Sequence, residues 1–284
     1  MSHGVGQKWL IRGQELCLDV PHIMGILNVT PDSFSDGGSF IDPEAALSHA
    51  LKMIKQGARI IDVGGESTRP GSHAVDAVEE ISRIVPVIEK LALESDILIS
   101  ADTHKAVVAQ AALTAGAHII NDVSAGLSDP DMFELISHNK CGYIMMHMQG
   151  TPETMQNDPS YENVISEIKY FFEDRLDAAT LAGVKSEQIV FDPGIGFGKT
   201  LNDNLNILGN MSGLELANHP LMLGASRKSF IGMIDGSKAG ERMGGSLAAV
   251  LSAHIQNVRL FRVHDVAETR QLLDIFTAIQ KHSV

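Results

Sequence analysis

The sequence is poor in cysteine and in basic residues, and both shortages remove classes of protein. Among its 284 residues are only two cysteines, Cys17 and Cys141, which form no C-x-x-C pair. Such a count favours no disulfide framework and points to a reducing compartment, the cytoplasm. Lysine and arginine number 22 against 35 acidic residues, for a formal net charge of −13. That balance argues against nucleic acid or an anionic membrane as the main partner.

Other signatures are also absent. No apolar run approaches the length of a membrane span, and residues 1–10 lack the apolar core of a secretory signal. No H-E-x-x-H, Cys/His cluster, G-x-G-x-x-G or G-x-x-x-x-G-K-[ST] occurs, and GASRKS at 224–229 is not a G-x-S-x-G elbow. The sequence therefore gives no support to a zinc site, a nucleotide fingerprint or a serine nucleophile.

One pattern recurs along the chain: an apolar run rich in Ile, Val, Leu and Met ends in polar residues, and a segment of helical periodicity follows. The predicted strands are 22–29, 58–65, 96–102, 118–123, 142–148, 189–194, 221–226 and 260–266. The predicted helices are about 43–56, 76–93, 104–115, 129–139, 160–182, 201–213, 240–257 and 266–281. Strands apolar on both faces that alternate with helices indicate parallel pairing. We therefore predict one α/β domain over 1–284, a (β/α)₈ TIM barrel, with an N-terminal β-hairpin within residues 1–20 that turns at Arg12-Gly13-Gln14.

Polar residues follow all of the predicted strands. In chain order they are Asn28, Asp62, Asp102, Asn121 with Asp122, His147, Asp192, Arg227 with Lys228, and Arg262 with His264. A single Asp or Asn in this position is commonly a turn former or a helix cap. Because the carboxyl ends of barrel strands meet at one face, the whole set instead indicates a shared site.

The residue types restrict what that site could bind. Asp102, Asn121 and Asp192 suit a flat heterocycle, because a carboxylate matches two adjacent N–H donors. Lys228, Arg262 and His264 supply positive charge for a phosphate or an electron-rich ring. Arg262 and His264 are two residues apart, so on a strand both side chains point the same way.

Two Gly-rich loops, 64–72 and 192–200, are typical of binding loops or lids above a barrel. The second carries Phe197, whose ring could pack on an aromatic substrate. Asn28 has few carboxylates near it in the sequence, which suits a weakly held Mg²⁺ completed by substrate phosphate and water.

Seven stretches together resemble one enzyme family, the dihydropteroate synthases of the folate pathway. They are MGILNVTPDSFSDGG, IIDVGGESTRPG, AHIINDVSAG, MHMQGTPETMQ, DPGIGFGK, SRKSFIG and RVHDV, which stand in the family's order over nearly the whole chain. The resemblance implies that 6-hydroxymethyl-7,8-dihydropterin diphosphate condenses with p-aminobenzoate to give 7,8-dihydropteroate and diphosphate. It also implies a cytoplasmic homodimer, with Mg²⁺ as cofactor, that is a target of sulfonamides.

The same resemblance implies roles for individual residues. Asp102, Asn121, Asp192, Lys228 and Arg262 would bind the pterin. Asn28, Arg262 and His264 would bind the diphosphate, with Asn28 as the metal ligand. Ser67, Thr68, Arg69, Pro70, Phe197, Ser229 and Asp36 would form the p-aminobenzoate side and its loops. Lys228, Arg262 and His264 are the residues implied to act in catalysis, by a dissociative route through a pterin methylene cation.

Three alternatives stay open. A methyltetrahydrofolate methyltransferase would share the pterin carboxylates, but loops 64–72 and 192–200 favour a diphosphate and an aryl amine. A Schiff-base aldolase would use Lys228, which would then be expected as a desolvated lysine inside a strand. A non-catalytic paralogue would be expected to have lost some of the diphosphate or loop residues, and all are present.

Overall fold

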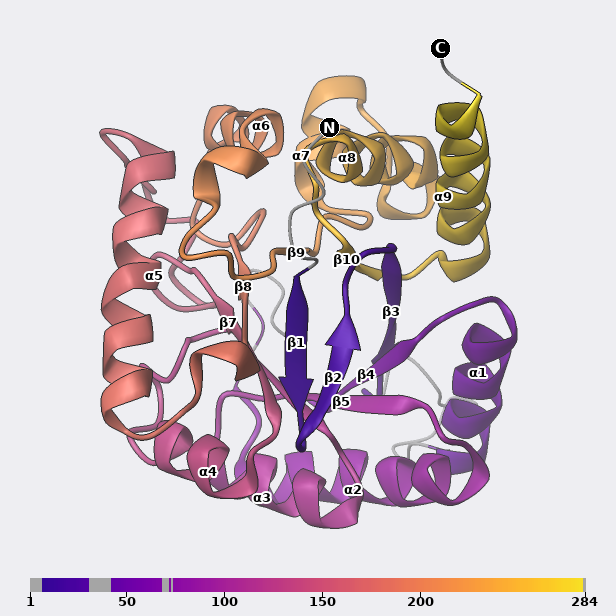
Figure 1. Ribbon diagram of the computed structural model, residues 1–284, viewed down its shortest axis with the longest axis vertical. Helices are drawn as coiled ribbons and strands as arrows, with labels where there is room; N and C mark the ends of the chain where they lie inside the picture. Colours follow the sequence, from indigo (N-terminus) through magenta and orange to yellow (C-terminus); the bar gives the residue numbers. More distant parts are fainter. Residues whose placement is uncertain (1–6, 31–41, 68–71, 73, 283–284) are drawn as a thin grey trace.

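Eight parallel strands form the centre of the described part of the chain (Figure 1). The computed structural model describes residues 7–30, 42–67, 72 and 74–282. The strands are β3 (His22–Asn28), β4 (Ile60–Gly64), β5 (Leu98–Asp102), β6 (Ile119–Asp122), β7 (Gly142–Met146), β8 (Ile189–Asp192), β9 (Met222–Leu223) and β10 (Leu260–Val263). Their order is β8-β7-β6-β5-β4-β3-β10-β9. A single bridge between Phe191 and Leu221 brings β8 and β9 together, so the sheet nearly closes into the predicted barrel.

Helices surround the strands, as Figure 1 shows. They are α1 (Pro43–Lys55), α2 (Ala77–Glu94), α3 (Ala106–Ala115), α4 (Met132–Asn139), α5 (Val164–Leu181), α6 (Leu201–Gly209), α7 (Ser229–Asp235), α8 (Met243–Ile255) and α9 (Val266–Lys281). Short 3₁₀ turns occur at Ser186–Gln188, Met211–Leu214 and Ala239–Glu241. None of the helices in the described ranges combines the length and apolar composition that a membrane crossing requires.

The start of the helix predicted over 43–56 agrees with the structure, and the start of the helix predicted over 129–139 does not. Asp42 caps α1, accepting from the Glu44 N–H at 2.9 Å, with Pro43 in the first turn. The second expected start, at Asp129, is wrong, because α4 begins only at Met132. The Asp129 carboxylate instead accepts from the backbone N–H of Ala106, at 2.7 Å, and so joins this loop to the first residue of α3.

The structure departs from the predicted elements most clearly after β8. The strand predicted over 221–226 is only Met222–Leu223, because the chain turns away and Arg227 adopts a left-handed backbone (φ 58°). Helix α7 follows at once and was not predicted. Its seven residues are too few for a clear helical period, although Gly236 ends it in the left-handed conformation usual after a helix.

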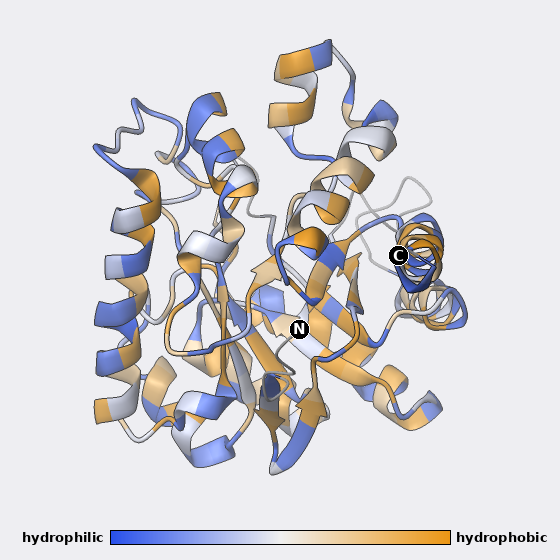
Figure 2. Cartoon of the chain, turned by 45° about the horizontal axis from the view of Figure 1, so that its top comes forward, coloured by the Kyte–Doolittle hydropathy of each residue, from blue (hydrophilic) through white to orange (hydrophobic). Residues whose placement is uncertain are grey.

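One apolar core lies inside the barrel and a second lies between the barrel and the helices. The outer and larger core packs the strands against the helices, and Figure 2 shows the strands dominated by hydrophobic residues. The inner core fills the barrel at the strands' amino ends. It contains Trp9, Ile11, Leu18, Met24, Ile60, Ile119, Ile144, Val190, Met222 and Leu260. The lower barrel is therefore a packed interior and not a channel.

The N-terminal hairpin closes this lower end. Strands β1 (Lys8–Ile11) and β2 (Gln14–Cys17) pair antiparallel around Arg12 and Gly13, so the predicted hairpin is confirmed. Trp9 is fully buried, and its indole N–H donates to the Gln188 carbonyl at 2.7 Å. A Cβ on Gly142 would lie 3.0 Å from the Trp9 ring, so the glycine makes room for the indole. The assignment of residues 1–284 to one domain stays a prediction.

We expect Trp9→Ala to destabilise the protein by about 3–5 kcal/mol, because it leaves a cavity where the buried indole fills the inner core. Urea unfolding would measure the loss. Trp9→Phe keeps a ring but removes the donor to a buried carbonyl, and should cost about 1–3 kcal/mol. Val20→Ala, at a position 59% exposed, is the control. If Trp9→Ala lowers the free energy of unfolding no more than the control does, the indole does not stabilise the inner core.

Candidate active site

The alternation of side chains along the strands builds a polar layer above the inner apolar core. Ile60, Ile119, Val190 and Leu260 face the barrel interior, and the residues two positions further on must face it too. Those residues are Asp62, Asn121, Asp192 and Arg262, and Ser100 takes the same place two residues after Leu98 in β5. The barrel therefore changes from apolar to charged within one layer, at the carboxyl ends of the strands.

Arg262 is the centre of this layer. Its Nε donates to Asp62 Oδ2 and its Nη2 to Asp102 Oδ2, each at 2.6 Å. Asn121 Nδ2 also donates to Asp62 Oδ2, at 3.2 Å. Burial alone lowers the pKa of Arg262, but Asp62 and Asp102 more than offset this and the net shift is upward. Burial raises the pKa of Asp102, against the opposing effect of Arg262.

Asp192 presents a carboxylate to the same space from β8. Its Oδ1 accepts from the Gly194 N–H at 2.8 Å, and the side chain is almost fully buried. Burial raises the pKa of Asp192, while the Gly194 N–H and the Lys228 charge act in the opposite direction. A Cβ on Gly224 would lie 3.3 Å from Asp192 Oδ2, so the absence of a side chain there leaves this oxygen approachable.

Lys228 lies between Asp192 and the loop that follows it. Its Nζ donates to the Ile195 carbonyl and stands 4.0 Å from the centroid of the Phe197 ring. Burial lowers the pKa of Lys228 to about 7, with Asp192 opposing the shift. The lysine is desolvated, as an aldolase would require, but it precedes α7 and is not inside a strand. The structure thus brings Lys228, Phe197 and Asp192 together.

Two polar residues at strand ends serve the scaffold. Asp122 faces outward and accepts from the backbone N–H groups of Ser124 and Gly126 and from the Tyr143 hydroxyl, all at 2.7 Å. His147 faces the side chain of Lys199, with 3.0 Å between Nδ1 and Nζ. The bond from the Ser124 N–H is the contact two residues on that Asp commonly makes in a turn.

Lys199 holds the second Gly-rich loop from within. Only 3% of the residue is exposed, and its Nζ donates to the Phe197 carbonyl at 2.9 Å. Burial lowers its pKa to about 7. Lys199 could not be assigned a function from the sequence, because nothing in DPGIGFGKT indicates that its side chain points inward.

The residues expected at the diphosphate side occupy neighbouring strands. Asn28 ends β3, and His264 directly follows β10, which pairs with β3. The His264 ring Nδ1 lies 3.0 Å from the Ser226 hydroxyl. Ser229 is the exposed first residue of α7.

The first Gly-rich loop is described only in part. The Ser67 carbonyl accepts from the Ser72 hydroxyl, and the Glu66 carboxylate from the Val75 N–H at 3.4 Å. The predicted site residues Thr68, Arg69, Pro70 and Asp36 lie outside the described residues.

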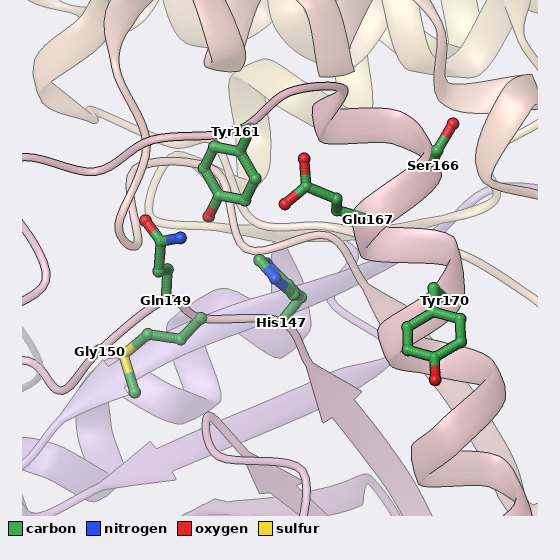
Figure 3. Close-up of a pocket in the computed structure, with 8 residues that line it drawn as sticks. His147, Gln149, Gly150, Tyr161, Ser166, Glu167 and Tyr170 are labelled. Atoms are coloured by element: carbon green, nitrogen blue, oxygen red, sulfur yellow. The ribbon is translucent and has the colours of Figure 1, made fainter.

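A pocket of about 520 Å³ lies at the rim, between the end of β7 and helix α5 (Figure 3). It is lined by His147, Met148, Gln149, Gly150, Tyr161, Ser166, Glu167 and Tyr170. Of the polar residues expected at the strand ends, His147 lines it, and the charged cluster inside the barrel, which holds Asp102, Asn121, Asp192 and Arg262, is the better candidate site.

Comparison with known proteins identifies relatives over nearly the whole chain. Residues 24–264 match the family described as pterin binding enzyme. The dihydropteroate synthase of Escherichia coli K12 is 44% identical over 271 residues, which is 95% of this chain and 96% of the relative.

Solved structures of dihydropteroate synthases also resemble this chain over nearly its whole length. The Yersinia pestis dihydropteroate synthase in a sulfonamide drug complex superposes with a TM-score of 0.91 at 41% identity, covering 97% of this chain and 100% of the other. The Xanthomonas albilineans dihydropteroate synthase with 4-aminobenzoic acid gives a TM-score of 0.91 at 40% identity, covering 98% and 100%.

We expect Gly194→Ala to disturb the loop that supports Asp192 and Lys228. Gly194 has φ +67°, and an added Cβ would lie 2.0 Å from the His147 carbonyl oxygen. The overlap should lower the free energy of unfolding by about 1–3 kcal/mol. Gly209→Ala is the control, because nothing lies within 4 Å of its Cβ position. Equal unfolding midpoints in urea for the two variants would contradict the close approach.

Proposed function

The chain belongs to the pterin-binding enzyme family and, within it, to the dihydropteroate synthases, and we propose specific roles for its residues in that reaction. It is an enzyme that joins 6-hydroxymethyl-7,8-dihydropterin diphosphate to p-aminobenzoate, forming 7,8-dihydropteroate and diphosphate. The proposal concerns which side chains hold each substrate and how the leaving group is stabilised.

The observation that carries the proposal is the convergence of Asp102, Asn121 and Asp192 on one buried space with two cations. A pterin is flat and has adjacent N–H donors on its 2-amino edge. Carboxylates at that edge make paired, charge-assisted hydrogen bonds. Lys228 donates to the pterin's acceptor atoms, and the planar guanidinium of Arg262 stacks on the ring.

The diphosphate lies toward the ends of β3 and β10, where Asn28, Arg262 and His264 bind it. Mg²⁺ fits this place: the Asn28 amide supplies a hard oxygen ligand, and no cluster of three or more His, Cys, Asp or Glu occurs within the described residues. Asn28 would hold the ion by one oxygen, which would leave the remaining ligands to water and to the substrate's phosphate oxygens. When bound, it neutralises charge on the leaving diphosphate.

The reaction proceeds by loss of diphosphate before attack. The bond from the pterin methylene carbon to oxygen breaks, and its electron pair leaves on the diphosphate. The aryl amine of p-aminobenzoate then bonds to the methylene cation and gives up a proton. The protein supplies positioning and charge stabilisation, and needs no strong nucleophile of its own.

The p-aminobenzoate side is formed by Phe197, Ser229 and the loop Ser67 to Pro70, with Asp36 in the covering loop. Phe197 supports this assignment best, because its ring lies under the Lys228 ammonium and its carbonyl is held by Lys199. An aryl amine that packs on this ring would meet the pterin held by the same lysine.

A homodimer and a cytosolic location are also part of the proposal. The buried residues of the apolar segment 246–253 face the rest of this chain, which argues for ordinary packing there. Exposed apolar side chains are instead present on α7 and at the start of α8, at Met233, Ile234 and Met243. Cys17 and Cys141 are both free thiols, which suits a reducing compartment.

Purified protein given the pterin diphosphate, p-aminobenzoate and Mg²⁺ should form dihydropteroate. Lys228→Met should weaken pterin binding about tenfold to a hundredfold, because it removes a charged donor. Arg69→Ala should affect turnover with p-aminobenzoate more than pterin affinity. Lys90→Met, at a surface lysine paired with Glu44, is the control. Pterin binding without any product would favour a non-catalytic paralogue, and equal effects on both substrates would contradict the residue roles.

Asn28→Ala should raise the Mg²⁺ concentration needed for half-maximal activity about tenfold. The affinity for a pterin that lacks the diphosphate should not change, because the role proposed for Asn28 is to hold the metal and the leaving group. A Mg²⁺ titration of both proteins measures the first effect, and pterin fluorescence the second. An unchanged Mg²⁺ requirement would exclude Asn28 as the ligand.

A further inference from the structure

Asp62 lies at the bottom of the site, and the sequence placed it among the strand-end residues without an individual role. Its side chain is fully buried. Oδ2 accepts from Arg262 Nε at 2.6 Å and from Asn121 Nδ2 at 3.2 Å. Oδ1 is buried as well and has no hydrogen-bond partner among the described residues. Both side chains that touch Asp62 belong to the proposed pterin site.

Asp62 lies one layer deeper in the barrel than Asp102. In the register of β4 and β5, Asp62 is opposite Ser100, whereas Asp102 is opposite Gly64. Successive residues on the same face of a strand lie two positions apart, so Asp102 stands nearer the mouth. The two carboxylates therefore hold different nitrogens of Arg262 at different depths, Nε below and Nη2 above.

The different depths of Asp62 and Asp102 determine which contact of Arg262 a bound ligand can replace. A pterin that enters from the mouth and takes both oxygens of Asp102 competes with Arg262 Nη2 for Oδ2. The contact of Nε with Asp62 lies beneath and is not contested. Arg262 can thus release Asp102 and turn about Nε without leaving the site.

Asp62 also determines how Asn121 is oriented. An ionised carboxylate only accepts hydrogen bonds, so the Asn121 amide must direct its NH₂ group toward Asp62. Its carbonyl oxygen then faces the other way, as an acceptor for a ligand N–H. A neutral amide at position 62 would allow the opposite orientation as well.

We propose that Asp62 is a positioning residue that anchors Arg262 through Nε and fixes the acceptor orientation of Asn121, so that pterin entry exchanges only the contact between Arg262 Nη2 and Asp102. This inference rests on the proposed pterin site. Asp62 acts through its two neighbours and does not touch the substrate.

The first test is Asp62→Asn, which keeps the shape and removes the charge. The dissociation constant for 6-hydroxymethyl-7,8-dihydropterin, followed by its fluorescence, should rise about tenfold or more. The KM for p-aminobenzoate should change by less than about twofold. Asp274→Asn is the control, because Asp274, like Asp62, accepts from the Nε of an arginine, Arg270, but on the exposed face of α9. Unchanged pterin binding by folded Asp62→Asn would overturn the proposal.

The second test needs no variant at position 62. In nitrogen-15 NMR spectra of the native protein, the Arg262 Nε–H signal, assigned with Arg262→Lys, should exchange slowly with solvent both without and with bound pterin. Fast exchange in the free protein, or loss of protection when pterin binds, would contradict the proposal that Asp62 holds Arg262 through Nε. This result stands even where Asp62→Asn does not fold.

The two tests separate this inference from the reaction. Product formation by native protein together with full pterin affinity in Asp62→Asn would refute the anchor and leave the synthase function intact. A protected Nε–H in native protein that forms no dihydropteroate would refute the function and leave the anchor intact.

Discussion

One guanidinium, which is largely but not fully buried, holds the candidate site together. Arg262 faces Asp62 and Asp102 at once, in a polar layer that lies above the apolar inner core of the barrel. Three carboxylates gather there with Arg262 and Lys228, and removal of either cation would leave buried negative charge without compensation. The same arrangement prepares the site for a ligand, because carboxylates that are partly paired in the free protein can exchange a cation for the N–H donors of a heterocycle.

The two ends of the barrel have separate tasks. The amino ends of the strands are filled by apolar side chains and covered by the hairpin with Trp9, so this half supplies stability. The carboxyl ends carry the charges, which are costly to bury and are retained where a substrate can compensate them. The loop 192–200 contacts both lysines, since Lys199 holds the Phe197 carbonyl and the Phe197 ring lies under the Lys228 ammonium.

Much of the barrel could be predicted, because each strand is a short apolar run and each helix carries its own period. Boundaries near β9 and α7 could not be predicted, since a two-residue strand and a seven-residue helix hold too few residues for a period to show. The candidate site was predicted as a set of strand ends. Asp122 and Asp62 show the limit of that reasoning: both follow isoleucine-rich runs, yet one faces outward to a turn and the other inward to Arg262.

The sequence alone determined the alternation of strands and helices, the hairpin, and the motifs that identify the family, because these depend on residues close together in the chain. Only the tertiary structure decided which charges meet. Arg262 and Asp62 are 200 residues apart, and their contact follows from the closure of the barrel, which places β10 next to β3 and β3 next to β4. The inward turn of Lys199 was decided in the same way, because a buried amine requires acceptors that distant backbone supplies, here including the His147 carbonyl.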